Sequence, residues 1–594
     1  MSIHNSRVVT SPEIKTCQNC KNPFTIEPDD FAFYEKMKVP PPTFCPECRM
    51  IRRMLFENER QLFRHKDEIS GKNIFSEFPP QVQAKVYDYE YWQSDACDPM
   101  DYGREYNFSR PFFAQFRELM YDVPWVSRSA RNLINSDYAH GASNLKDCYL
   151  CFNLGDCERC AYVTDANFMK ESLDCTTVAR NELCYECTNM IDSYQTHFSN
   201  RCDKCHDVWF SRDCTGCSNC FGCANLRNRQ YYIFNQPYSR EDYFATLEQF
   251  GLGSHQSLEE IKKQVRQFSL SLPYKFMAGV HNVNVSGDII ASGKNVHTSY
   301  NIADGENIKY SQGLSREAKD SYDFTVWGEH SELMYEVLTS GSGCSGLKFT
   351  IDCWPADRDI EYSFKCMSSN NLFGCVGLRK KSYCIFNKQY TPDEYKTLRE
   401  KIIQHMNDMP FSDKEGRIYR YGEFFPPEFS PFAYNETLAQ DFFPLSKEGT
   451  EAKGYVWRDP ELREFQTTLD AQDLPDHIKD VDDSILREVL KCVSCAKAFR
   501  LIPMELEFYR RMTLPLPRVC HKCRFIERTK YRNQPKFWPR SCQCAGAGSG
   551  NGVYRNETSH FHNQEHCPNE FETSYAPDRP EIIYCETCYQ SEII

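Results

Sequence analysis

The sequence predicts a mainly β fold, with two tandem β-solenoid units that carry helical caps and are flanked by small modules built on paired C-x-x-C motifs. Three observations predict it. C-x-x-C pairs recur with one spacing near both ends of the chain, and small residues recur every nine positions across residues 127–225. A stretch at 220–243 also aligns without gaps to residues 372–395. Repeats of this kind indicate stacked structural units rather than one globular core.

The composition indicates a folded chain of several domains. Its 594 residues are too many for one hydrophobic core, and 41% of them are hydrophobic. The net charge of −13 excludes a general attraction for nucleic acid or anionic lipid, so any such contact needs a local basic patch. No stretch is apolar enough to span a bilayer, and residues 1–17 lack the apolar run of a signal peptide. We therefore expect a cytoplasmic protein whose thiols stay reduced.

The two ends of the chain carry copies of one module. In each copy, 24 residues separate the first C-x-x-C pair from the second, and aromatic, proline and arginine positions also match, such as Arg49 with Arg524. Four thiolates in two pairs suit tetrahedral zinc, which would supply much of the stability of so small a module. The expected zinc ligands are Cys17, Cys20, Cys45 and Cys48 in the first copy and Cys492, Cys495, Cys520 and Cys523 in the second.

Residues 542–594 are predicted to form a third, modified copy. Cys567 and the pair Cys585 and Cys588 are in place, but Gln564 stands where the partner of Cys567 is expected. A replacement ligand must come from further upstream, and we favour Cys544. The candidates are Cys542, Cys544, His560 and His562. Two zinc sites and a third in the tail are therefore expected.

The middle of the chain has a nine-residue period. In nonads counted from Ser127, the fourth position is always Ala, Ser or Cys, and the seventh is frequently Cys. Of the thirteen cysteines in this segment, only Cys217 lies outside these two columns. Small residues in fixed columns predict stacked coils with the thiols packed inside. Similarity between alternate nonads predicts about 18 residues per coil, with about 27 as the alternative.

Two other uses of these thiols are left open. Dense thiolate pairs suit soft metal ions, so metal inside the coil is one alternative. Redox work or disulfides are the other, although a reducing cytosol opposes them.

The second solenoid unit is predicted from the repeat at 372–395, which has eleven identities to 220–243. Aromatic positions before it recur at 12 to 14 residues, so its coils are expected to be less regular. A capping box that begins at Thr391 predicts a helix to Met406, and Ser239 is placed to cap a helix after the first unit. Such helices would cover the exposed strand edge of the last coil.

These observations divide the chain into eight parts. We expect an N-terminal zinc module (1–66), an aromatic-rich connector (67–126), a Cys-rich first solenoid with its cap (127–250), a helical linker (251–279), a second solenoid with its cap (280–410), an acidic linker (411–488) and two further zinc modules (489–541 and 542–594).

A basic strip lies in the second zinc module. Residues 510–541 hold ten Lys or Arg and one Glu, with aromatic residues between them. Such a strip is typical of a contact surface for RNA or single-stranded DNA. The alternative is that its arginines pair with the acidic linker or with the solenoid surface. The candidate nucleic-acid residues are Arg518, Lys522, Arg524, Arg528, Lys530 and Arg532.

The module C-x-x-C…F…FY.KM..P.P..C-x-x-C-R resembles a treble-clef zinc-ribbon domain. The full arrangement is similar to a family of uncharacterised zinc-ribbon proteins of small-genome, uncultivated bacteria. The matching stretches are 101–116, the IFN..Y motifs that end both solenoids, and 567–589. The resemblance implies treble-clef zinc modules and a bacterial cytoplasm, and it implies no activity.

The leading interpretation is a non-enzymatic zinc-binding scaffold that binds a macromolecular partner, either a protein or RNA or single-stranded nucleic acid. The sequence contains no Ser-His-Asp order, no Walker loop and no open three-ligand zinc motif. It indicates no membrane partner and no small-molecule substrate. The alternatives are RNA or single-stranded DNA binding through 510–541, and a metal-handling or redox protein that uses the solenoid thiols.

Overall fold

The structure, a computed structural model, describes residues 11–459, 465–545, 554–563 and 565–593. It is mainly β, with many parallel strands and a smaller share of helices. In the described chain, no helix has both the length and the apolar character needed to cross a membrane.

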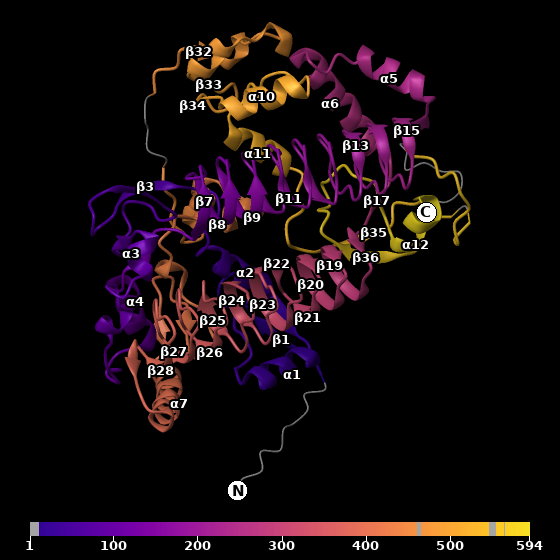
Figure 1. The fold of residues 1–594 in the computed structure, drawn as a ribbon. Coiled ribbons are helices and arrows are strands. Elements are labelled where there is room, and N and C mark those ends of the chain that lie inside the picture. The colour runs from indigo at the N-terminus through magenta and orange to yellow at the C-terminus, as the bar shows by residue number, and fades with distance from the viewer. Residues whose placement is uncertain (1–10, 460–464, 546–553, 564, 594) are drawn as a thin grey trace. The chain divides into compact units, whose positions relative to one another are not determined.

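The described chain forms two compact units (Figure 1). The first unit contains residues 11–128, 277–459 and 534–537. The second contains residues 129–276 and the described residues of 460–533 and 538–594. Each unit therefore combines one end of the chain with a stretch from its middle.

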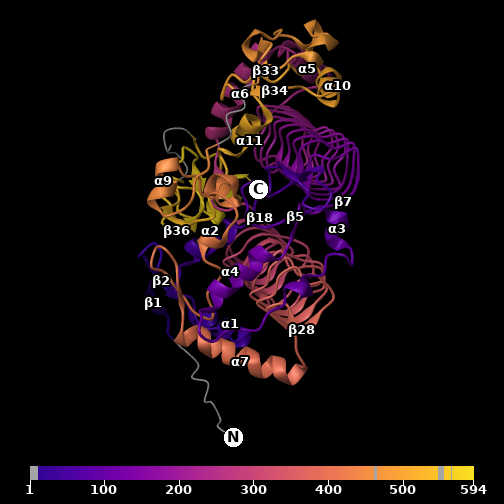
Figure 2. The ribbon, with the colours of Figure 1, turned by 90° about the vertical axis from the view of Figure 1, so that its left-hand side faces the viewer.

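Residues 129–237, which we call the first ladder, are a stack of short parallel strands in the second unit. From β7 to β12 and from β13 to β15, each strand pairs with the next at a step of twelve residues, as in Thr164 with Thr176. Single parallel bridges such as Tyr149 with Ala161 keep the same step between strands. Figure 2 shows the turns of this stack nearly end-on, as nested loops beside the label β7. The strands are β7 (Ala130–Ile134), β8 (Ala139–Lys146), β9 (Cys151–Glu158), β10 (Thr164–Asn167), β11 (Thr176–Ala179), β12 (Thr188–Ile191), β13 (His206–Trp209), β14 (Ser218–Phe221) and β15 (Gln230–Ile233).

Within the first ladder the backbone repeats every three residues. From Gly141 to Phe234, every third residue has a positive φ. Asn and Asp tolerate this left-handed conformation better than other side chains with a Cβ, and they recur in this column. Up to Cys223, the residue after each of them is buried, and the buried core of the ladder consists of this inward column alone. Four sides of three residues therefore make one twelve-residue step.

This register corrects the predicted coil length, because the step is twelve residues rather than 18 or 27. Nine and twelve are both multiples of the three-residue backbone repeat. Residues nine apart therefore both lie in the inward column, although paired strands are twelve residues apart. Cys148 and Cys151 both point inward because a left-handed residue, Leu150, lies between them. Cys217, the exception to the nine-residue pattern, belongs to the same inward column.

Residues 279–389, the second ladder, form a similar parallel stack in the first unit. Its step is twelve residues between Lys294 and Glu306 but thirteen between Tyr322 and Tyr335. The extra residue in some turns explains why aromatic residues recur there at irregular spacing. The strands are β18 (Gly279–Val280), β19 (Val283–Ala291), β20 (Lys294–Ala303), β21 (Glu306–Lys309), β22 (Gln312–Leu314), β23 (Lys319–Trp327), β24 (Tyr335–Ser340), β25 (Lys348–Ile351), β26 (Arg358–Glu361), β27 (Asn370–Phe373) and β28 (Ser382–Ile385).

Helices follow both ladders. The predicted capping box is present before α7 (Pro392–Asp408): the Thr391 hydroxyl accepts a hydrogen bond from the Glu394 amide, and the Glu394 carboxylate accepts one from the Thr391 amide. After the first ladder, the Ser239 hydroxyl caps α5 (Arg240–Gln249). The other helices of ten or more residues outside 1–66 and 489–594 are α4 (Phe112–Asp122) and α6 (His255–Leu270), among the described residues.

The segment expected to be an acidic linker is packed rather than solvated. Residues 411–459 lie in the core of the first unit, where Tyr419 and Phe425 are buried. In the second unit, the described part of the linker buries Ile478 and Ile485. Its Asp residues are mainly exposed between these apolar ones. The segment therefore has many charged residues and also a buried apolar face, and counting its charges did not predict that face.

Candidate metal centres

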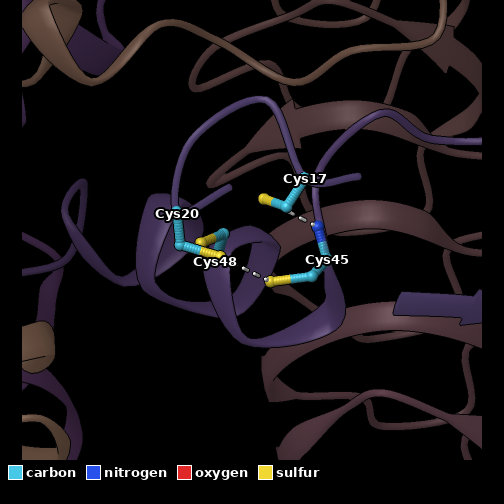
Figure 3. Close-up of side chains that lie close together, drawn as sticks. All are labelled: Cys17, Cys20, Cys45 and Cys48. Carbon is cyan, nitrogen blue, oxygen red and sulfur yellow. Dashed lines mark hydrogen bonds between the residues drawn. The ribbon is translucent and has the colours of Figure 1, made fainter. Parts of the chain in front are cut away.

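The first module brings four thiols together at the start of a helix. Strands β1 (Glu13–Thr16) and β2 (Pro23–Ile26) form a hairpin whose turn carries Cys17 and Cys20. Cys45 is the N-cap of α2 (Pro46–Met54), and Cys48 lies in its first turn. Figure 3 shows the four side chains gathered between the hairpin turn and the helix.

The distances between these thiols suit a metal ion. All four sulfur atoms lie within 4.8 Å of one another, and Cys20 Sγ is 3.7 Å from Cys45 Sγ. A tetrahedral zinc ion with Zn–S bonds of about 2.3 Å places its sulfur ligands about 3.8 Å apart. The backbone amide of Cys45 also donates to Cys17 Sγ at 3.3 Å, and the helix N-terminus favours a thiolate there. The group could therefore hold a metal ion.

The second module repeats this geometry, as the duplicated spacing predicts. Cys492 follows β33 (Leu490–Lys491), Cys495 precedes β34 (Ala498–Phe499), and Cys520 is the N-cap of α11 (His521–Thr529). Sulfur distances of 3.8 Å join Cys492 to Cys523 and Cys495 to Cys520.

The same amide contact is present at this second centre. The Cys520 amide donates to Cys492 Sγ at 3.3 Å, as Cys45 does to Cys17 in the first module. Burial opposes ionisation of Cys492, but hydrogen bonds from nearby backbone amides lower its pKa to about 7. The backbone is therefore arranged to accept a thiolate, which is the form that binds metal.

In the tail, the structure corrects the predicted fourth ligand. Cys542, rather than Cys544, lies with Cys567, Cys585 and Cys588, with all four sulfur atoms within 4.8 Å of one another. Cys542 directly follows β35 (Trp538–Ser541). Cys567 stands three residues before β36 (Glu570–Thr573), just as Cys20 stands three residues before β2.

A backbone contact gives Cys542 the same place as Cys17. The amide of Cys585 donates to Cys542 Sγ at 3.2 Å, as the amide of Cys45 donates to Cys17 Sγ. The C-x-x-C pair of the other modules is thus split here by an insertion, residues 543–566. The sequence signal for Cys542 was its position directly after a strand, which a search for C-x-x-C pairs does not detect.

Buried arginines fix each of the first two modules to a ladder within its own unit. In the first unit, Arg49 contacts Asp323 at 2.9 Å, and Arg53 contacts the same carboxylate at 3.1 Å. In the second unit, Arg524 and Arg528 contact Asp174 at 2.8 and 2.7 Å.

Further carboxylates complete both contacts. Glu336 and Glu423 accept from Arg52 in the first unit, and Glu505 accepts from Arg524 in the second. Each guanidinium group is paired with at least one carboxylate of the protein and is shielded from solvent. The acidic partners in the ladders were not identified from the sequence.

This arrangement removes two residues from the predicted nucleic-acid surface. Arg524 and Arg528 have side chains only 3% and 5% exposed, so they cannot reach a phosphate backbone in this structure. Their ion pairs with Asp174 agree with the alternative interpretation, in which these arginines pair with the surface of the ladder. Arg518 donates to the carbonyl groups of Ala471 and Pro475. Of the remaining candidates, Lys522 and Lys530 are exposed and Arg532 is half-buried.

The thiols of the first ladder are placed for packing. All of its cysteines are buried, and each S–H group lies near the backbone carbonyl two residues before it. Most also lie near the carbonyl nine residues after, as Cys202 does with Asn200 and Ser211. Ser199 makes the same two contacts through its hydroxyl. Within residues 129–237, all of which the structure describes, no group of three side chains is close enough together to hold a metal ion. Cys and Ser are therefore interchangeable parts of one inward column.

In comparisons with known proteins, no family model and no curated protein matches the chain. What the structure defines is a mainly β, cysteine-rich protein with zinc-ribbon-like modules whose thiol groups could hold metal ions.

Proposed function

We propose that this chain is a non-enzymatic zinc-binding scaffold that binds a macromolecular partner. The two ladders would be β-solenoids, each carrying a zinc-ribbon module of the treble-clef type. The observation that carries the proposal is the buried ion-pair contact between Arg524 and Asp174, with its counterpart between Arg49 and Asp323. A module held by buried charges on a stack of strands is part of a rigid surface rather than a mobile appendage.

The ligand sets support a structural metal. Four thiolates around one ion leave no open coordination position for water or substrate, and an all-sulfur tetrahedral set suits zinc. The packed thiol columns support a structural role for the ladder cysteines over metal storage or redox chemistry. The resemblance to zinc-ribbon proteins of small-genome bacteria supports the same class, a zinc protein of the bacterial cytoplasm.

A protein partner is favoured over a nucleic acid because burial of Arg524 and Arg528 weakens the basic strip. RNA or single-stranded DNA is the second candidate, and it would have to use the exposed Lys522 and Lys530. Contacts of this kind are salt-dependent, so the two candidates can be separated by experiment.

The scaffold role is tested by hydrogen exchange on the full chain before and after zinc removal with a chelator. We expect the backbone amides of both terminal modules to lose protection while the ladder amides keep theirs. Zinc analysis of the eluate should show metal released from the modules only. Unchanged protection in the modules, or metal released from a variant that lacks their cysteines, would overturn the proposal.

The nucleic-acid candidate is tested with a labelled single-stranded RNA of about 20 nucleotides at low salt. The variant is Lys522→Glu with Lys530→Glu, and the matched control is Lys396→Glu with Lys401→Glu, which changes two exposed residues of α7. Equal, weak binding by the wild type and both variants is expected for a protein-binding scaffold. A loss of affinity in the first variant alone would favour RNA.

A further inference from the structure

The insertion that splits the tail motif carries a second set of metal-ligating side chains. Cys544, His560 and His562 lie with Cys588, and their ligand atoms are all within 4.8 Å of one another. Cys588 also belongs to the four-thiol group of the tail. We propose that the C-terminal module holds two metal ions, most simply two zinc ions, bridged by the Cys588 thiolate.

The distances in the second set are those of a mixed sulfur and nitrogen site. Cys544 Sγ is 3.1 Å from His560 Nδ1 and 3.5 Å from His562 Nε2. His562 Nε2 is 3.3 Å from Cys588 Sγ. A tetrahedral zinc ion with Zn–N bonds of about 2.0–2.1 Å and Zn–S bonds of about 2.3 Å separates such ligands by about 3.6 Å.

The other ring nitrogen of each histidine is already bonded, which fixes the nitrogen that can bind metal. His560 Nε2 lies 2.9 Å from the Glu592 carboxylate and donates to it, and both side chains are fully buried. His562 Nδ1 donates to the carbonyl of Glu565 at 2.7 Å. The lone pairs of His560 Nδ1 and His562 Nε2 therefore both face the sulfur atoms, as in metal sites oriented by outer-shell acceptors.

Glu592 is itself held in place. Its carboxylate accepts hydrogen bonds from the Tyr554 hydroxyl at 2.6 Å, the Thr558 hydroxyl at 2.9 Å and the Glu557 amide at 2.6 Å. These contacts fix the position of the carboxylate oxygen that faces His560 Nε2.

A metal ion also accounts for the contacts of Cys544. Its sulfur atom lies beside both imidazole nitrogens, and one S–H group can donate to only one of them, which leaves the other nitrogen to the Cys588 thiol. The Asn556 side-chain amide also donates to Cys544 Sγ at 3.1 Å, which suits a thiolate. One divalent ion satisfies the thiolate and both nitrogens together.

Charge balance favours two ions over one. A single zinc ion with four thiolates carries two excess negative charges, and an ionised Cys544 beside it would add a third. Two zinc ions with five thiolates and two neutral imidazoles leave one negative charge. Buried excess charge is costly, so the shared Cys588 thiolate is better accommodated when both sites are filled.

The test is the number of zinc ions per full-length chain, measured by native mass spectrometry and elemental analysis. We expect four ions in the wild type and three in His560→Gln with His562→Gln. The control His255→Gln changes a histidine outside every metal-ligating group of the described chain and should keep four. Three ions in the wild type would overturn the inference while leaving zinc binding by the scaffold intact.

A second measurement covers the case in which the double variant loses the whole tail centre. In the cobalt(II)-substituted wild type, a thiolate bridge couples two ions, so the magnetic moment per cobalt is lower than for isolated ions. Four bound cobalt ions with a reduced moment support the bridge. Four ions with the moment of isolated centres would overturn it.

Discussion

Arg524 donates to the carboxylate of Asp174 across 2.8 Å, and both side chains are buried. Asp174 has a positive φ and so occupies a corner of the first ladder. Asp323 occupies the same kind of corner in the second ladder and binds Arg49, which matches Arg524 in the sequence repeat. The duplicated modules therefore use one contact twice, once in each unit.

Substitution of the shared carboxylate should destabilise the second unit strongly. Asp174→Asn leaves two buried guanidinium groups without their common anion, and losing one partner of a buried pair costs about 3–5 kcal/mol. The free energy of unfolding, measured by urea denaturation of the full chain, gives the value. Glu171→Gln is the matched control because Glu171 makes partly exposed pairs with Arg159 and Arg511, each worth under about 1 kcal/mol. Equal losses in the two variants would contradict the buried contact.

The inward column should accept serine and reject larger side chains. Cys202→Ser keeps a donor near the carbonyls of Asn200 and Ser211, so the free energy of unfolding should change by less than about 1.5 kcal/mol. Cys202→Leu adds volume inside a filled turn and should cost about 1–3 kcal/mol. Urea denaturation of both variants checks the order. A larger loss for serine than for leucine would argue against thiol packing.

Thiol reagents should separate the cysteines into two groups. The thirteen cysteines of the first ladder and the five of the second are all buried. Burial raises the pKa of Cys151 and Cys187, whereas hydrogen bonds with neighbouring thiols lower the pKa of Cys148, so the common protection of these thiols is their burial away from the reagent. After treatment with a metal chelator, native protein should expose only cysteines of the terminal modules to labelling, as located by mass spectrometry of peptides. Rapid labelling of ladder cysteines before unfolding would contradict this prediction.

A buried acid in the second ladder should make the first unit less stable at high pH. Burial raises the pKa of Asp357 to about 7, and its carboxyl group accepts a hydrogen bond from the Ser369 amide. A folded pKa above the unfolded value gives a contribution that is full below about pH 4 and is lost as pH rises through 7.

The measurement compares the wild type with Asp357→Asn, which keeps the acceptor but does not ionise. Their free energies of unfolding should diverge between pH 5 and pH 8, with the variant gaining up to about 3 kcal/mol relative to the wild type. Metal effects are common to both proteins and cancel in the difference. A constant difference across this range would show that Asp357 does not titrate there.

The thiol groups of the first two modules were predictable because their thiols come in local pairs, one on a hairpin turn and one at a helix start. Cys542 was not, because residues 543–566 separate it from Cys567 and only strand pairing shows their relation. The docking of modules was equally hidden. Arg49 and Asp323 are 274 residues apart, and no local pattern joins a helix to a distant corner of a ladder.

Stacked strands with inward thiols were predicted for the first ladder, but the step of twelve residues between strands was not. Cysteine concentrates in two of every three inward positions, and this made a nine-residue period visible. The third position also takes larger residues such as Leu154, Val163 and Met190, so it did not look like part of the same column. The sequence pattern reported only where small residues recur. The number of residues between paired strands is determined by the backbone, which turns at every third residue.

Each of the first two modules pairs with a ladder that is distant in sequence, so the two partners of each contact are synthesised at different times. Asp323 leaves the ribosome 274 residues after Arg49, which at roughly 5–20 residues per second is a delay of about 14–55 s. During that time the arginines of the first module lack the carboxylates that they contact in the folded unit, Asp323 and Glu336. The first ladder is complete long before Arg524, which follows Asp174 by 350 residues, is made. Neither unit can form all of its buried ion pairs until the second half of the chain has emerged, so both units are completed late in synthesis.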